Sequence, residues 1–154
     1  MNYFLVKTEP GVFSIDDLQR VKREPWDGVR NYQARNIMRD DMKIGDKVLF
    51  YHSNATPPGV AGICKVVSKP YPDASQFDPN SKYFDPKSSP DNPKWVLVDM
   101  AFVQKFTRLI SLEELKSHPE LFEMRLLQHG NRLSVMPVKK AEFDFIVKLS
   151  KLNQ

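Results

Sequence analysis

Short apolar stretches of this chain have the β-branched and aromatic content of strands, and turn residues separate them. Asn54 and Gly59 stand between two such stretches and predict a hairpin. In the second stretch of that hairpin, apolar residues occupy both alternating positions, which indicates that both faces of the strand are covered. We predict strands over residues 2–7, 47–53, 60–67, 95–107 and 132–138.

Helical spacing appears in the intervening segments. Ser14 followed by Asp17 predicts a helix start for a short segment that ends near Lys22, and Ser111 with Glu114 has the spacing of a capping box. A closing helix is expected over 139–152, and another over 31–42. The helix over 31–42 has an apolar face formed by Ala34, Ile37, Met38 and Met42. Its opposite, basic face carries Asn31, Arg35 and Arg39.

This order of elements favours a mixed α/β fold around a small, strongly curved sheet or barrel. The 154 residues are enough for one domain, so we expect a single domain over 1–154. Residues 70–94 contain six of the twelve prolines and also four aromatic residues. Long loops in compact domains tend to be functional, and we expect this one to fold against the body and border the site.

Composition narrows the class of protein. Hydrophobic residues make up 41% and charged residues 27%, and no apolar run is long enough for a membrane span. The start at Met1 lacks the features of a signal peptide, and the single Cys64 excludes an internal disulfide. We therefore expect a soluble cytoplasmic protein with no membrane partner. The net charge of +4 gives a mild attraction to polyanions, so affinity for nucleic acid must come partly from a pocket.

Residues 26–36 combine stacking rings, cations and amides. Trp26 and Tyr32 each offer a flat face to a base, whereas Arg30 and Asn31 carry donors that read polar edges. Trp26 alone is also compatible with a hydrophobic plug at the edge of the core. If it lines a pocket instead, its loss should leave the thermal midpoint unchanged. Gly28 indicates a positive φ or a close approach of the backbone. A helix start favours an anion, so we expect phosphate contacts from Arg30, Asn31, Arg35 and Arg39.

Polar residues at strand ends complete the candidate site. Lys7, Thr8 and Glu9 follow the first strand, where they either cap it or line the mouth of a pocket, with Glu9 accepting from an exocyclic amine. His52 and Ser53 are adjacent on a strand, so their side chains point to opposite faces and do not form a nucleophile pair. We expect the far side of the site to be lined by His52, Ser53, Arg132 and Ser134.

Chemistry that needs a metal or a cofactor has no motif here. The three histidines share no metal-ligand spacing, Cys64 lies among valines as a buried small hydrophobe, and no phosphate-binding glycine loop occurs. We therefore expect no metal, no cofactor and no catalytic residue.

Several of these motifs together resemble the EVE-domain family. The resemblance covers nearly the whole chain and rests on residues 3–10, 26–36, 50–54, 91–95 and 132–137. It implies a PUA-like fold, in which a curved mixed sheet is flanked by helices. It also implies a relationship to the YTH domains, which hold a methylated adenine in an aromatic cage.

The resemblance implies a non-catalytic reader of modified bases. Proposed ligands of the family are 5-methylcytosine and its derivatives in DNA, and bacterial members are linked to restriction of modified DNA. The partner is then nucleic acid with a modified base, DNA being favoured and RNA remaining open. Whether an effector protein also takes part stays open. The chain begins at its first strand, without the basic extension of nuclear eukaryotic members, so a bacterial, cytoplasmic protein is expected, or a nuclear one if eukaryotic.

Three other functions stay open. RNA binding is the first, because stacking does not distinguish the two sugars. An enzyme that acts on a modified base is the second, with Glu9 or His52 as the acid or base. A protein-interaction module that holds a peptide or small anion is the third.

Overall fold

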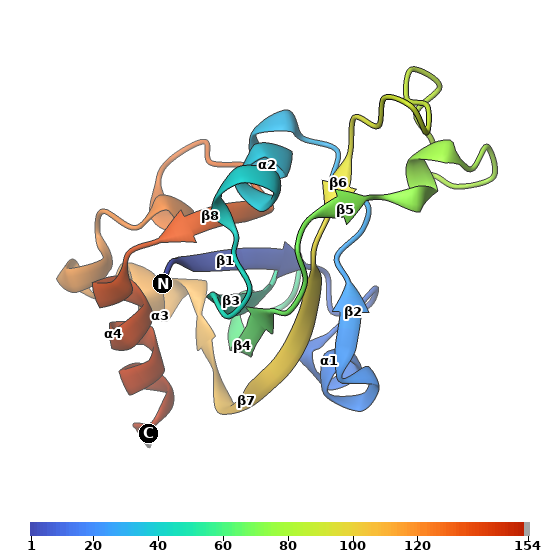
Figure 1. Cartoon of the computed structure of the whole chain (residues 1–154). Coiled ribbons are helices and arrows are strands. Elements are labelled where there is room, and N and C mark those ends of the chain that lie inside the picture. The colour runs from blue at the N-terminus through green and yellow to red at the C-terminus, as the bar shows by residue number, and fades with distance from the viewer. Residues whose placement is uncertain (153–154) are drawn as a thin grey trace.

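The computed structural model describes residues 1–152, and its centre is a curled sheet of six strands (Figure 1). The strand order is β2-β7-β4-β3-β1-β8, in which β1 and β3 run parallel and the other neighbours run antiparallel. Because β2 and β8 end the order, the sheet is an open half-barrel. The strands are β1 (Tyr3–Thr8), β2 (Arg23–Pro25), β3 (Lys47–His52), β4 (Gly59–Val66), β7 (Asp99–Ser111) and β8 (Val135–Val138).

The curl comes from the central pair β4 and β7. Their register shifts between Val60 and Gly62 and again between Ile63 and Cys64, and such bulges bend a strand and increase its twist. A side chain at Gly62 would collide with the backbone carbonyl of Gln104 on β7, so only glycine permits this close approach. The predicted hairpin is confirmed, because β3 and β4 are antiparallel neighbours.

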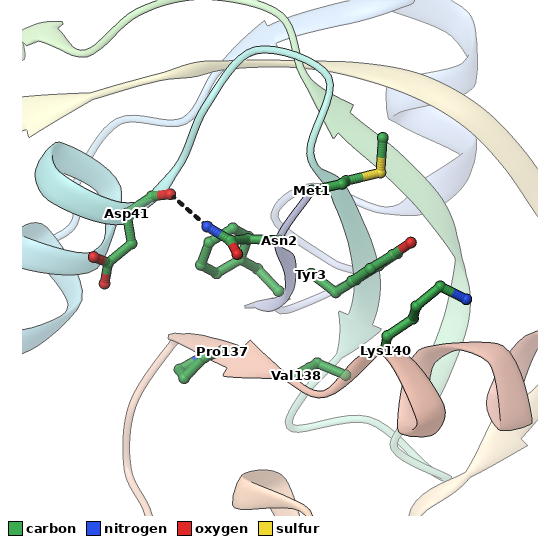
Figure 2. Close-up of a pocket in the computed structure, with 8 residues that line it drawn as sticks. Met1, Asn2, Tyr3, Asp41, Pro137, Val138 and Lys140 are labelled. Carbon is green, nitrogen blue, oxygen red and sulfur yellow. Dashed lines mark hydrogen bonds between the residues drawn. The ribbon is translucent and has the colours of Figure 1, made fainter.

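The amino-terminal end of β1 borders an open hollow (Figure 2). This hollow, called the Tyr3 hollow below, has a volume of about 390 Å³. The Asn2 side chain donates from Nδ2 to the Asp41 carbonyl there, at 3.3 Å. Its lining consists of Met1, Asn2, Tyr3, Phe4, Asp41, Pro137, Val138 and Lys140.

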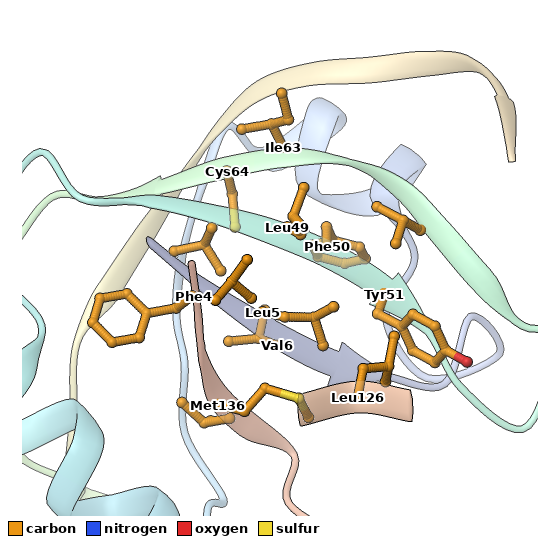
Figure 3. Packing of buried hydrophobic residues seen from close by; sticks show 14 of the residues in the cluster. Phe4, Leu5, Val6, Leu49, Phe50, Tyr51, Ile63, Cys64, Leu126 and Met136 are labelled. Atoms are coloured by element: carbon orange, nitrogen blue, oxygen red, sulfur yellow. The ribbon is translucent and has the colours of Figure 1, made fainter. Parts of the chain in front are cut away.

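Apolar side chains of β1, β3 and β4 fill the interior of the half-barrel (Figure 3). Phe4, Leu49 and Phe50 are among those with almost no exposed surface. The prediction that both faces of the 60–67 strand are covered is confirmed, since residues 59–64 are buried without interruption. Cys64 is buried among them, as expected, and burial raises the pKa of its thiol far above the ordinary value.

Four α-helices surround this sheet in the described part of the chain, together with 3-10 turns and one π-helical turn. Helix α1 (Ile15–Val21) begins at the predicted start, where Ser14 and Asp17 form reciprocal hydrogen bonds. Helix α2 (Tyr32–Asn36) continues as a π-helical turn, η1 (Ile37–Asp41). The helix predicted over 31–42 is thus confirmed in extent, and its apolar face is buried. No helix within residues 1–152 has the length and apolar character needed to cross a membrane.

The other two helices also lie where they were predicted. Helix α4 (Lys140–Ser150) closes the described chain, and α3 (Leu112–Lys116) starts at Ser111. Only half of the expected capping box forms at Ser111, because the Glu114 carboxylate binds Arg108 at 2.7 and 2.9 Å instead. Two short 3-10 turns, η3 (Pro119–Leu121) and η4 (Arg125–Leu127), connect α3 to β8.

One predicted strand was wrong at its start. The segment predicted over 95–107 is divided at Val98 into β6 (Val96–Leu97) and the start of β7. Strand β6 pairs with β5 (Tyr71–Pro72) in a separate two-stranded sheet. A 3-10 turn, η2 (Ala74–Phe77), follows β5 in the chain. The loop folds against the body as predicted: buried Gln76 donates from Nε2 to the carbonyls of Asp73 and Trp95. The last strand is also shorter than the predicted 132–138, since β8 starts at Val135.

Candidate functional site

A cavity of about 350 Å³ lies at the carboxyl end of β1, between the turn after β2 and the loop that follows η2. We call it the Trp26 cavity. Its volume falls near the lower end of the range for small-molecule pockets, which is adequate for one planar heterocycle. The lining consists of Lys7, Thr8, Val12, Phe13, Glu24, Pro25, Trp26, Asp27, Gly28, Val29, Arg30, Tyr83 and Ser134.

Trp26 forms part of both the cavity wall and the hydrophobic core. Its ring meets Phe50 edge to face at 5.7 Å and Phe13 at 6.2 Å, and only 8% of the residue is exposed. The backbone N–H of Trp26 donates to the Val98 carbonyl at 2.9 Å. The core and pocket roles of Trp26 are therefore not alternatives, and its removal is expected to lower stability. A ring so enclosed offers a ligand only the part of its surface that faces the cavity.

A buried aspartate fixes the turn that forms the cavity. Asp73, whose side chain is 1% exposed, accepts from the backbone N–H of Gly28 at 2.9 Å and from Arg30 Nη1 at 3.1 Å. Burial by itself raises the pKa of Asp73, but hydrogen bonds from Ser75, Gly28 and Arg30 outweigh it and lower the pKa below its ordinary value. Asp73 therefore stays ionised and holds the 25–30 turn in place.

All three guanidinium nitrogens of Arg30 have partners. Nε and Nη2 donate to the Tyr83 carbonyl at 3.0 and 2.9 Å, and Nη2 also reaches Ser75 Oγ at 3.1 Å. Nη1 donates to the carbonyl of Val29 besides Asp73. Arg30 thus ties the turn to the loop that carries Tyr83, and its contribution in this structure is to the shape of the cavity.

Gly28 has both properties that the sequence indicated. Its φ of +82° lies in the left-handed region, and a Cβ there would sit 2.6 Å from the ring of Tyr83. Glycine therefore permits the Tyr83 ring to pack directly on the turn. Tyr83 also lies near two cations, with Arg30 Cζ 5.5 Å and Lys82 Nζ 5.0 Å from the ring centroid.

Three ionisable side chains of the cavity have shifted pKa values. Partial burial, followed by the charge of Asp27, raises the pKa of Glu24. Partial burial, followed by the charge of Asp73, raises the pKa of Asp27, against a smaller lowering by Arg30 and Lys82. Burial lowers the pKa of Lys7. In each case burial disfavours the charged form, so a ligand that supplies a hydrogen-bond partner would stabilise that form.

Five of the predicted site residues line this cavity: Lys7, Thr8, Trp26, Arg30 and Ser134. Lys7 and Ser134 are joined by a backbone hydrogen bond of 2.9 Å between β1 and the segment before β8. This bond brings together two segments that are far apart in the sequence.

Four other predicted residues lie outside the lining, three of them at or next to strand ends and Arg132 in the segment before β8. The Glu9 carboxylate accepts from Asn54 Nδ2, and His52 Nε2 accepts from the backbone N–H of Ile15 at 3.1 Å. Burial lowers the pKa of His52, against an opposing effect of Asp16. The Ser53 backbone N–H donates to Thr8. Arg132 is exposed.

The residues predicted on α2 form a separate group. Asn31 caps the helix through a hydrogen bond from the Ala34 N–H, and Tyr32 stacks on Trp95 with 4.6 Å between the ring centroids. Arg35 donates from Nη1 to the Lys94 carbonyl at 2.7 Å, and Arg39 pairs with its neighbour Asp40. Tyr32 and Trp26 therefore do not face each other across one slot.

Phe13, Glu24, Asp27 and Tyr83 line the cavity but were not among the predicted site residues. Asp27 stands inside the 26–36 run, and Tyr83 is one of the aromatic residues of the loop that was expected to border the site. Phe13 and Glu24 gave no local signal. Within residues 1–152 no three histidine, cysteine or carboxylate side chains gather as a metal site would require.

Comparisons with known proteins agree with this architecture. A family model described as the EVE domain matches residues 2–149. Thymocyte nuclear protein 1 of Rattus norvegicus is 45% identical over 167 aligned positions, which cover 96% of this chain and 73% of that protein. The human protein of the same name is 43% identical with the same coverage.

Two solved structures are similarly close. A protein from Pseudomonas syringae has a TM-score of 0.92 and 46% identity, covering 96% of this chain and 99% of its own. Human THYN1 protein in complex with DNA that contains 5-methylcytosine has a TM-score of 0.92 and 43% identity, with all of both chains covered. The half-barrel and its cavity define a mixed α/β, PUA-like module. This chain belongs to the EVE-domain family.

Proposed function

We propose that this protein is a non-catalytic reader of DNA that receives an extruded, modified cytosine-type base in the Trp26 cavity. The observation that carries the proposal is a cavity sized for one heterocycle, with aromatic walls and two carboxylates in its lining. Further support comes from human THYN1 protein, which was solved with DNA containing 5-methylcytosine and aligns with the whole chain.

The carboxylates supply a basis for choosing cytosine. No salt bridge within residues 1–152 involves Glu24 or Asp27. Cytosine carries an amino donor on its pairing edge, and acidic side chains accept from it, whereas thymine presents a carbonyl acceptor at that position. A partly desolvated carboxylate without a salt-bridge partner gains most from such a donor. Glu24 and Asp27 therefore favour a base with an exocyclic amine.

The apolar wall sets what a methyl group can add. Val12 and Phe13 stand beside Trp26 in the lining, and a methyl group buried there contributes on the order of 1 kcal/mol. Discrimination between methylated and unmethylated cytosine from that contact alone has a ceiling of roughly 200-fold. Extruding the base costs a few kcal/mol, so single-stranded or mismatched DNA should bind more tightly than a perfect duplex.

The absence of catalysis is part of the proposal. Its support is that both candidate acid or base groups have partners outside the cavity lining, Glu9 with Asn54 and His52 with the Ile15 backbone. Arg35 remains the proposed phosphate contact on α2, since its guanidinium forms no salt bridge in the described chain.

An affinity panel tests the proposal. Fluorescence anisotropy would compare single-stranded DNA oligonucleotides that differ at one central position, which holds thymine, cytosine or 5-methylcytosine, and RNA oligonucleotides with the same bases. We expect affinity to rise in that order, with DNA bound at least as tightly as RNA. Equal affinity for all three bases would refute base reading, and a preference for RNA would assign the site to RNA instead. Mass spectrometry of the nucleosides afterwards should find no altered base.

A charge-matched pair of variants makes the test specific to the cavity. The double variant Glu24→Ala/Asp27→Ala should lose about tenfold of the preference for cytosine over thymine. The double variant Glu120→Ala/Asp144→Ala removes the same two charges from exposed positions and should keep the preference. Loss of two negative charges generally strengthens the attraction to DNA. If only the cavity variant binds the cytosine strand more weakly, the change in net charge is therefore not the cause.

A further inference from the structure

Outside the Trp26 cavity, an exposed aromatic ring rests on a buried one. Tyr32 on α2 is 52% exposed, and its ring is nearly parallel to that of Trp95, at an interplanar angle of 20° and a centroid distance of 4.6 Å. Arg35 Cζ lies 4.7 Å from the Tyr32 centroid and 5.9 Å from that of Trp95. We call Tyr32, Trp95 and Arg35 the α2 platform.

Trp95 is held firmly as the base of this platform. Its indole Nε1 donates to Asp85 at 2.8 Å, and its backbone N–H donates to Gln76 Oε1 at 3.0 Å. Its carbonyl accepts from the Asp73 backbone N–H and from Gln76 Nε2. Only 5% of Trp95 is exposed. Tyr32 is thus oriented in advance on one face, so a planar ligand that stacks on its open side loses little side-chain entropy of the protein.

The platform also carries a cation that no carboxylate neutralises by a salt bridge within residues 1–152. Arg35 donates to the Lys94 carbonyl and to Asn36, and both of these partners are uncharged. Arg39, one turn further along, is paired with Asp40 and serves as the contrast. An arginine placed beside a stacking ring is the combination that single-stranded nucleic acid uses for its phosphates and bases.

Arg30 connects the platform with the Trp26 cavity. Its Cζ lies 5.5 Å from the Tyr83 centroid on the cavity side and 5.3 Å from the Trp95 centroid on the platform side. One loop supplies both Tyr83 to the cavity and Trp95 to the platform. Helix α2 lies on the same side of the molecule as β5 and β6 (Figure 1). A strand that places one base in the cavity can lay a neighbouring nucleotide over Tyr32.

We propose that Tyr32 stacks the base that flanks the one in the cavity, and that Arg35 contacts the phosphate backbone beside it. This inference rests on the proposed function, and it adds a second subsite with its own ligand, an unmodified nucleobase of the same strand. Contacts to flanking nucleotides set the sequence context of enzymes and readers that extrude a base. Because stacking strength grows with ring area, the protein should prefer a purine at the flanking position.

A purely structural role for Tyr32 would be to cover Trp95. An aliphatic side chain of similar size also covers an indole, but it offers no π face to a base. Tyr32→Leu therefore separates the two roles, and Tyr32→Phe, which keeps the ring and removes only the hydroxyl, is the matched control. Urea denaturation of both variants checks that the fold is retained.

The experiment measures affinity for single-stranded DNA with 5-methylcytosine at the centre and either adenine or an abasic residue on each side in turn. For the wild type and Tyr32→Phe, the abasic residue on one side should cost about fivefold or more. For Tyr32→Leu the same replacement should cost less than twofold. In the wild type, 2-aminopurine at that flanking position should lose fluorescence on binding, a readout that needs no variant.

The possible results distinguish failure of the platform inference from failure of the proposed function. If the abasic residue costs nothing in the wild type, or costs Tyr32→Leu as much as the wild type, the platform does not stack a base and the inference is overturned. In both of those cases the preference for 5-methylcytosine over thymine can persist, and the proposed function then stands without the platform. If the wild type shows no preference for the central base, the proposed function fails, and the inference that depends on it fails too.

Discussion

The two ends of β1 open on hollows of similar size but different chemistry. The Tyr3 hollow at the amino-terminal end has a volume of about 390 Å³, and the Trp26 cavity at the carboxyl end has about 350 Å³. In the Tyr3 hollow, Lys140 (Figure 2) is exposed. Its Nζ is paired with Asp144 Oδ2 at 2.6 Å. In the Trp26 cavity, Glu24 and Asp27 are in no salt bridge of the described chain, and partial burial raises the pKa of each.

The two hollows therefore differ in the environment of their charged lining residues and not in volume. The Trp26 cavity is distinguished by features that are energetically unfavourable by themselves, namely partly desolvated charges and a backbone turn with Gly28 at positive φ. Buried Asp73 holds this turn in place. Groups whose environment disfavours their charged form are enriched at functional sites. In the Tyr3 hollow the charged lining residues Asp41 and Lys140 are exposed, so substitutions of these charges should have small effects.

Replacement of the aromatic wall should have the largest effect. Trp26→Ala removes a ring that packs on Phe50 and Phe13, and we expect a loss of about 3–5 kcal/mol in the free energy of unfolding, measured by urea denaturation. Tyr3→Ala removes a half-buried ring of the Tyr3 hollow that is tilted by 42° against Phe143, with 4.7 Å between the centroids, and should cost about 1–2 kcal/mol. A smaller loss for Trp26→Ala than for Tyr3→Ala would contradict the assignment of Trp26 to the core.

The clamp between Arg30 and Asp73 should have the next largest effect. Arg30→Met leaves the buried Asp73 carboxylate without the positive charge of Arg30. We expect a loss of about 2–4 kcal/mol in the free energy of unfolding, less than for a fully buried pair because the Arg30 side chain is 21% exposed. Arg30→Lys keeps a positive charge beside Asp73 but lacks the forked donors, so it should lose less than Arg30→Met. Lys140→Met in the Tyr3 hollow should leave the urea midpoint unchanged. Equal losses for Arg30→Lys and Arg30→Met would show that the unpaired charge of Asp73 is not the source of the cost.

The comparison also shows which features the sequence carried. Local patterns predicted the strands and helices well: the capping residues Ser14 and Asp17, and the apolar face that includes Ile37 and Met38, lie where spacing placed them. The family resemblance supplied the PUA-like fold, which neither spacing nor composition determines. The break at Val98 was missed because β6 is as apolar as the strand it precedes, and only its pairing with β5 separates the two.

The candidate site was predicted in part, because a sequence displays residue types but not their partners. Arg30 has the composition of a ligand-binding residue, yet its hydrogen bonds go to Tyr83 and Asp73, more than forty positions away. Tyr32 lies six residues from Trp26, but the intervening turn directs the two rings to different surfaces. Glu24 and Asp27 join the cavity through a turn whose shape depends on Asp73, which no short-range pattern reveals.

The smallest expected effect concerns the carboxylate of Asp27 in the Trp26 cavity. Partial burial raises the pKa of Asp27 in the folded protein, so between the ordinary and the raised pKa the folded state binds more protons than the unfolded state. The free energy of unfolding must therefore fall as pH rises through that window, and this destabilisation persists at neutral pH.

Asp27→Asn removes the destabilisation caused by the buried charge and should raise the thermal midpoint at pH 7 by at most about 2 °C. This gain should vanish below the ordinary pKa of an aspartate. Asp41→Asn in the Tyr3 hollow measures what the loss of an exposed carboxylate does by itself. If the two variants changed the midpoint equally at pH 7, Asp27 would carry no penalty from burial, and the contrast between the hollows would rest on shape alone.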